Sequence, residues 1–204
     1  MKSSVEKSLT NSIISGLGIL LIIPFMVLFI IKANKPVEVV LYTLFTSFII
    51  IHYIFKILYY SLNKGTAKTT MKVLERNIST IVLYFLLLII NITYIKGIMG
   101  WLIFSLFIPV AIVGVIFNSI FNKKTSIIWI IMNSLLCLGS LTIIKGIILE
   151  KIYVSFILLG ILIPLGIIAF IFSGLNKKSF NIISNILYTL TLIGINLFLY
   201  LYII

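Results

Sequence analysis

Residues able to do chemistry are few in this chain, and their spacing limits what they could do. The 204 residues include one His, one Cys and four acidic side chains. His52 and Cys137 are too few for a Cys/His metal cage, and a Ser/His/Asp arrangement is not found either. The segment Gly16-Leu-Gly18 lacks a following Lys-Ser/Thr pair, so it is not a phosphate-binding loop. Motifs alone therefore predict no catalytic residue.

Three charged side chains stand out because they lie within or beside long apolar runs. Lys56 precedes the end of one run near Leu62, and Glu75 and Arg76 precede the next. A charge at the centre of a bilayer costs about 2.5–3.5 kcal/mol on insertion scales. Lys56 therefore either extends its ammonium to the membrane surface or meets a partner inside the protein. Mid-run His52 is expected to form a hydrogen bond between helices.

The elements that hold these side chains are predicted to be transmembrane helices. The chain is 62% apolar and only 10% charged, whereas a soluble domain is roughly half apolar and about a quarter charged. This excludes a soluble globular protein, a disordered protein and most nucleic-acid binders, despite the net charge of +12. A span needs about 20 residues. We expect one all-α membrane domain over residues 1–204, with seven spans at about 12–31, 37–61, 77–95, 98–121, 126–147, 152–173 and 180–203.

The basic residues predict the orientation of the bundle, because they are enriched in cytoplasmic loops. With the N-terminus inside, ten basic residues lie on the cytoplasmic side and five on the outside. We therefore expect a multi-pass protein of the cell membrane whose N-terminus is cytoplasmic and whose C-terminus is outside. Pro24, Pro109 and Pro164 fall within predicted spans, where neighbouring helices can satisfy the carbonyls that a proline frees.

Short motifs occur in a fixed order along the predicted spans. The first span opens with Asn11-Ser-Ile-Ile-Ser-Gly-Leu-Gly18, the second ends with Leu58-Tyr-Tyr-Ser-Leu62, and the third opens with Leu74-Glu-Arg-Asn-Ile78. Further motifs are Gly100-Trp-Leu-Ile-Phe104, Thr125-Ser-Ile-Ile-Trp-Ile-Ile-Met132 and Gly160-Ile-Leu-Ile-Pro-Leu-Gly166. Their order resembles that of the hemolysin III family, the bacterial branch of the progestin and adipoQ receptor superfamily. At the first three places this family has Asn-Ser-x-Thr-His-Gly-x-Gly, Leu-Tyr-His-Ser and Leu-Asp-His-Ser-x.

The resemblance implies seven spans with the N-terminus inside, and a zinc site held by three His near the cytoplasmic side. This chain carries other residues at those positions. The first His is replaced by Tyr60, and the His-x-x-x-His pair of the seventh span is replaced by Asn181 and Asn185. The supporting Asp and Ser positions carry Glu75 and Lys56, and two further family His positions carry Ser15 and Arg76. Zinc prefers His, Cys and carboxylate ligands, so we expect neither zinc nor another cofactor.

The replacements also predict a polar cluster. Lys56 and Tyr60 are one helical turn apart and share a face, and the family geometry would direct Lys56 toward Glu75. We therefore expect the Lys56 ammonium, or Arg76, to supply the positive charge that zinc supplies elsewhere. Amide side chains would complete the cluster by hydrogen bonding: Asn77, Asn181 and Asn185.

Three functions remain open from the sequence. The first is a hemolysin III-like membrane protein without zinc or hydrolase activity, with a cavity for an acyl chain and a role in lipid sensing or membrane homeostasis. Its partners would be membrane lipids or another membrane protein, and not nucleic acid. The second is an active lipid amide hydrolase with Glu75 as the base. The third is a small transporter, channel or immunity-type protein.

Overall fold

The apolar runs of the sequence form helices in the computed structural model. It describes residues 2–33, 35–63, 65–91, 97–120, 126–139, 153–174 and 178–202. Seven helices and no strand occur in these ranges, which confirms the all-α prediction. The helices are α1 (Lys2–Lys32), α2 (Pro36–Ser61), α3 (Thr66–Ile89), α4 (Gly97–Ile120), α5 (Ser126–Gly139), α7 (Tyr153–Gly174) and α8 (Lys178–Tyr202).

Most helix boundaries fall at the polar breaks of the sequence. α1 ends at Lys32, and α2 begins at Pro36, where a proline suits the first turn because its missing N–H would have no partner there. The main difference is α3, which begins at Thr66 rather than at 77. The segment before 77 is amphipathic, so it extends the helix without adding to an apolar run. Part of the predicted span at 126–147 lies outside the described residues.

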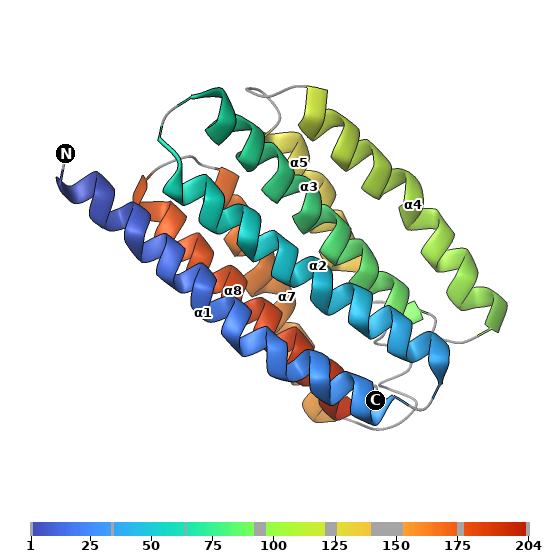
Figure 1. Cartoon of the computed structure of the whole chain (residues 1–204). Coiled ribbons are helices and arrows are strands. Elements are labelled where there is room, and N and C mark those ends of the chain that lie inside the picture. The colour runs from blue at the N-terminus through green and yellow to red at the C-terminus, as the bar shows by residue number, and fades with distance from the viewer. Residues whose placement is uncertain are drawn as a thin grey trace.

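The helices are arranged as a closed ring. Each contacts its neighbour in the order α1, α2, α3, α4, α5, α7, α8, and α8 returns to contact α1. α3 also contacts α5. Figure 1 shows the helices running roughly side by side, with α4 at one edge and α1 and α8 together along the opposite side. Helices from the two halves of the chain therefore lie close enough to build a shared site.

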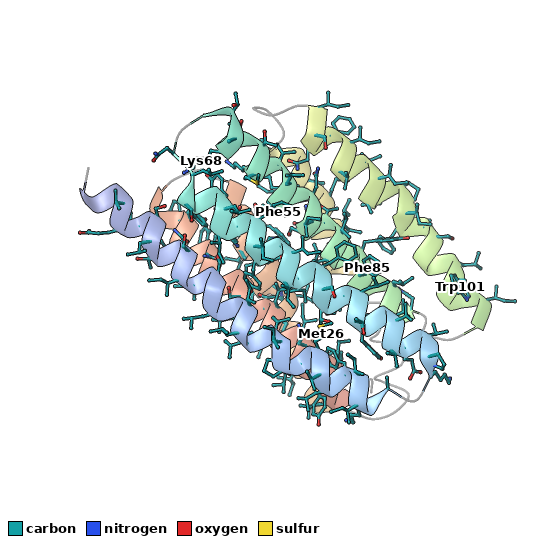
Figure 2. The ribbon with its side chains drawn as sticks, in the orientation of Figure 1. Met26, Phe55, Lys68, Phe85 and Trp101 are labelled. Atoms are coloured by element: carbon teal, nitrogen blue, oxygen red, sulfur yellow. The ribbon has the colours of Figure 1, made fainter. Side chains whose placement is uncertain are left out.

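Short connections place particular helix ends together. The start of α1 lies at the same end of the bundle as the connection between α2 and α3, as Figure 1 shows. We call this the basic end, because the larger group of basic residues is predicted there. Figure 2 shows Lys68 at this end and Trp101 near the opposite end of the bundle.

The outer surface of the ring is apolar. Four described helical segments are long and apolar enough to cross a membrane, and they are Val5–Lys32, Pro36–Ser61, Gly100–Ile120 and Phe180–Leu201. Large apolar side chains point outward from these helices, with Ile31 76% exposed and Leu106 71% exposed. A soluble monomer rarely exposes large contiguous apolar patches. The surface therefore suits contact with lipid.

The interior of the ring is packed by aromatic and aliphatic side chains from α2 and α3. Tyr42, Phe45 and Tyr53 of α2 are almost completely buried. Phe48 stacks on Phe85 of α3 with ring centroids 5.0 Å apart, and Figure 2 shows Phe85 on α3. This packing holds α2 against α3, the two helices that carry most of the charged side chains of the interior.

Two buried asparagines differ in their hydrogen-bond partners. Asn133 of α5 accepts a hydrogen bond from Thr80 of α3 at 3.2 Å. The Asn91 amide instead donates to the Leu87 carbonyl of its own chain segment at 2.7 Å. The backbone four residues earlier is always within reach of a helical side chain, so it competes with a neighbouring helix.

Candidate functional site

Polar side chains gather on facing turns of α2 and α3 at the basic end. On α2, Lys56, Tyr59 and Tyr60 follow an i, i+3, i+4 spacing that places them on one helix face. On α3, Lys72 and Glu75 are three residues apart and also share a face. Because α2 and α3 are adjacent in the ring, the two faces can meet.

These side chains line a small polar cavity that is completed by α7 and α8. Its volume is about 30 Å³, which exceeds the roughly 10–15 Å³ that one water requires. The lining combines ammonium, carboxylate, hydroxyl and amide groups, from Lys56, Tyr59, Tyr60, Lys72, Glu75, Ser173, Asn181 and Ser184. Four of the predicted site residues therefore converge, and they are Lys56, Tyr60, Glu75 and Asn181.

Lys56 points into the bundle instead of extending along the lipid-facing surface. Only 7% of the side chain is exposed. Its Nζ lies 4.8 Å from the ring centroid of Tyr188 on α8, a favourable contact between a cation and an aromatic face. Within the described part of the chain, the ammonium has no hydrogen-bond acceptor and no carboxylate within 4.0 Å. Lys56 therefore meets an aromatic partner inside the bundle.

The Glu75 carboxylate contacts His52 rather than pairing directly with Lys56. Glu75 Oε1 lies 3.7 Å from His52 Nε2, and His52 Nδ1 lies 3.2 Å from the Glu75 backbone oxygen. The predicted hydrogen bond of His52 to another helix is thus confirmed. The direct Lys56–Glu75 ion pair is not formed, because the imidazole occupies the position beside the carboxylate. Lys56 and Glu75 line the same cavity without forming a direct ion pair.

A second set of polar contacts continues from His52 into the bundle. The His52 ring lies 4.8 Å from the Tyr188 ring. The Tyr188 hydroxyl and the Ser79 hydroxyl are 3.0 Å apart. The cavity, His52, Tyr188 and Ser79 therefore form a connected polar region that reaches from the basic end toward the middle of α3.

Asn185 and Ser15 belong to a separate contact between α8 and α1. The Asn185 amide donates to the Asn11 carbonyl at 3.0 Å and to the Ser15 hydroxyl at 3.3 Å. Ser15 in turn donates to the Asn11 carbonyl at 2.9 Å. The expectation that Asn185 joins Asn181 at one site is wrong, because the extra turn of helix directs Asn185 toward α1. This cluster fastens the first helix to the last.

Arg76 and Asn77 are also turned away from the cavity, which corrects their predicted membership of the cluster. The Arg76 guanidinium carbon lies 5.0 Å from the centroid of the Trp129 ring on α5. Asn77 faces α4, where its amide donates to Ser119 Oγ at 2.9 Å and its oxygen accepts from Asn118 at 2.6 Å. Consecutive helical residues point about 100° apart, so Glu75, Arg76 and Asn77 cannot all face one site.

The pKa of the Lys72 ammonium is lowered by its position at the site. Lys72 lies before the predicted third span, in the basic-end segment of α3. Burial lowers its pKa to about 8, and the positive charge of Arg76 contributes in the same direction. Glu75 opposes this shift. At neutral pH the Lys72 amine is therefore still mostly protonated.

The residues of the cavity do not fit a zinc ion. Tyr60 and Asn181 are neutral and weak ligands, Asn185 faces α1, and Glu75 is the one carboxylate in the lining. Lys56 and Lys72 would repel a cation. In the part of the chain that the structure describes, no group of three or more His, Cys, Asp or Glu is arranged to hold a metal ion.

Several cavity residues were missed by the sequence reasoning. Tyr59 and Lys72 could have been found, because each shares a helix face with a predicted residue. Ser173 and Ser184 carry no such signal, since their place in the cavity depends on how α7 packs against α8. Tyr188 likewise contacts Lys56 only because of the relative rotation of α2 and α8.

Comparisons with known proteins do not identify a family for this chain. No family model, no curated protein and no solved structure matches it. The functional argument therefore depends on the residues and geometry described above.

Proposed function

We propose that this chain is a hemolysin III-like, seven-helix protein of the cell membrane that has no zinc hydrolase activity and acts in lipid sensing or membrane homeostasis. The observation that carries the proposal is the convergence of Lys56, Tyr60, Glu75 and Asn181 on one cavity. The resemblance assigns these four positions to the metal site and its surroundings. Here they bring an ammonium, a carboxylate, a phenol and an amide to the place where hydrolysis would need zinc.

The outer surface supports a role that involves lipid. An apolar groove of about 280 Å³ lies between α3 and α4. Its lining comes from one face of each helix, Ile81, Tyr84, Ile108, Ala111, Ile112, Val115 and Ile116. The polar cavity is much smaller, so an acyl chain would bind in this groove and not among the charged groups.

The proposal is tested by metal analysis and by topology mapping of the purified protein. We expect far less than one zinc per chain after purification in zinc-containing buffer without chelator. Single-cysteine variants made in a Cys137→Ala background should place the N-terminus in the cytoplasm and the segment after α8 outside. Stoichiometric zinc, or an even number of spans, would contradict the proposal.

A second candidate is a small membrane transporter or channel. The polar region that continues from the cavity through His52 to Tyr188 and Ser79 favours it. Intramembrane ionisable groups commonly mark ion or proton pathways. Reconstitution in liposomes separates the two candidates, because a transporter would carry ions or protons across the bilayer and a lipid sensor would not.

A further inference from the structure

The backbone of α3 fixes the tautomer of the His52 imidazole. His52 Nδ1 lies 3.2 Å from the Glu75 carbonyl oxygen, within the range of an N–H···O hydrogen bond. A carbonyl oxygen can only accept, so Nδ1 must carry the hydrogen. In a neutral imidazole the other nitrogen, Nε2, then carries a lone pair and can only accept.

This lone pair faces a second acceptor. Glu75 Oε1 lies 3.7 Å from His52 Nε2, and an ionised carboxylate has no hydrogen to donate. Nε2 has no hydrogen-bond partner among the described residues, although the His52 side chain is only 1% exposed. A buried polar atom without a partner is costly. Two acceptors therefore face each other across a gap that one proton would bridge.

An added proton satisfies both atoms, whichever of them carries it. On Nε2 it produces an imidazolium that donates to the Glu75 backbone through one nitrogen and to the Glu75 carboxylate through the other. On Oε1 it produces a carboxylic acid that donates to Nε2. Either state turns the 3.7 Å contact into a hydrogen bond. The imidazolium–carboxylate bond is charge-assisted, and such bonds are roughly twice as strong as neutral ones.

The pair is placed so that a proton can reach it from the basic end. The Glu75 side chain lines the polar cavity and is 13% exposed. His52 lies deeper, with its ring 4.8 Å from the ring of Tyr188 on α8. A proton from the cavity would therefore meet the carboxylate first and the imidazole second.

We propose that His52 and Glu75 together form a binding site for one exchangeable proton, which bridges Nε2 and Oε1 and joins α2 to α3. The proton enters from the cavity by way of the Glu75 carboxylate. The site depends on neither candidate function. Zinc content and topology test the first candidate, and passage of ions across liposomes tests the second, whereas the proton site is tested by titration of these two side chains.

Neighbouring positive charges set the affinity of the pair for its proton. Lys56 lies one helical turn after His52 on the same face of α2, and its charge acts on both His52 and Glu75. Its ammonium therefore competes with the proton for the negative charge of the carboxylate. Lys72 and Arg76 of α3 also interact electrostatically with Glu75 and act in the same direction.

The other ionisable groups around the pair are phenols, from Tyr53, Tyr59, Tyr60 and Tyr188. The remaining charged residues lie at helix ends. Those of α1 are near its two ends, and the one charged residue of α8, Lys178, is its first residue. α4 has no ionisable side chain, and α5 and α7 have one Cys and one Tyr. The charges that tune the site therefore come from α2 and α3.

The test is a nuclear magnetic resonance titration of the full chain in detergent micelles. His52 is the single histidine of the chain, so nitrogen-15 histidine gives one pair of ring signals. At high pH we expect a protonated Nδ1 and an unprotonated Nε2. On acidification one proton should bind, and the His52 ring nitrogens and the Glu75 carboxyl carbon should change with one common midpoint, because a coupled pair titrates as a unit.

Three variants separate the site from its surroundings. In Glu75→Gln the amide can donate to Nε2 without an added proton, so the proton affinity of His52 should fall at least about tenfold. Lys56→Met should move the midpoint to higher pH, because the competing ammonium is gone. Glu38→Gln is the matched control: it makes the same change on α2, in the first turn, about four helical turns before His52. It should leave the midpoint unchanged.

The wild type alone can overturn the proposal. A protonated Nε2 with an unprotonated Nδ1 at high pH would remove its premise. Separate midpoints for His52 and Glu75 would show that they do not share a proton. Ring signals that stay constant between about pH 4 and about pH 9 would show that no proton binds where carboxylates and imidazoles ordinarily titrate. If Glu75→Gln does not fold, the tautomer and the common midpoint still decide the question.

Discussion

Gly18 lies where α1 approaches α2, and one added methyl group there tests the packing between the two helices. A Cβ at Gly18 would lie 2.6 Å from Tyr53 Cζ and 2.8 Å from Tyr53 Cε1, well inside the roughly 3.5–4.0 Å of an ordinary carbon contact. Tyr53 is fully buried, so its ring cannot swing into a free space. Gly16 belongs to the same helix, and a Cβ there would meet nothing within 4 Å.

The pair of glycines separates two effects of an alanine. In a helix interior, replacing Gly by Ala is favourable by about 1 kcal/mol through helix propensity, and this gain applies at both positions. Overpacking of a filled interior costs about 1–3 kcal/mol, and it applies only at Gly18. We therefore expect Gly16→Ala to be at least as stable as the wild type, and Gly18→Ala to be about 1–3 kcal/mol less stable than Gly16→Ala.

The measurement is unfolding of each purified variant in mixed detergent micelles, followed by tryptophan fluorescence. A second substitution, Tyr53→Leu, removes the ring and should restore part of the loss in a Gly18→Ala background while lowering stability by itself. Equal unfolding free energies for Gly16→Ala and Gly18→Ala would refute the close approach of α1 to α2 that the structure shows.

Three further predictions concern contacts at and around the site. The Asn185 amide also donates to Asn11 Oδ1 at 3.2 Å, so a double-mutant cycle of Asn11→Ala and Asn185→Ala should give a coupling of about 0.6–1.5 kcal/mol in unfolding experiments, and additivity would argue against this side-chain contact. Because burial lowers the pKa of Lys72 from 10.5 to about 8, the unfolded chain binds more protons between these values, so this group makes stability rise with pH there. Carbon-13 methyl labelling should show the Lys72 titration near pH 8, and a midpoint near 10.5 would contradict its burial. Trp129→Leu should destabilise the protein by about 1–3 kcal/mol in the same unfolding assay by removing the cation–π contact with Arg76 and packing, whereas Trp129→Phe should cost less.

The helices were predictable because their ends coincide with strong local signals. Lys32 to Pro36 separates α1 from α2, and the connection between α7 and α8 is marked by Asn176-Lys-Lys-Ser179. The start of α3 was not predictable, because a span is recognised by continuous apolar sequence and the segment from Thr66 mixes polar and apolar residues. Such a segment is helical through its amphipathic face.

The candidate site was predictable only as far as residues share a helix face. Lys56 and Tyr60 were correctly placed together because a one-turn spacing fixes their relation. The partner of Glu75 was predicted wrongly, since whether His52 or Lys56 lies beside the carboxylate depends on the rotation of α2 against α3. Asn185 was misassigned for a similar reason, because the same helix face borders both the cavity and α1.

The closure of the ring by α8 has a consequence for the order of assembly. α2 and α3 precede α8 in the chain, yet Asn181 and Ser184 of α8 complete the cavity and Tyr188 covers Lys56. The surroundings of Lys56 and Glu75 are therefore complete only after the last helix has been synthesised and has joined α1 through Asn185 and Asn11.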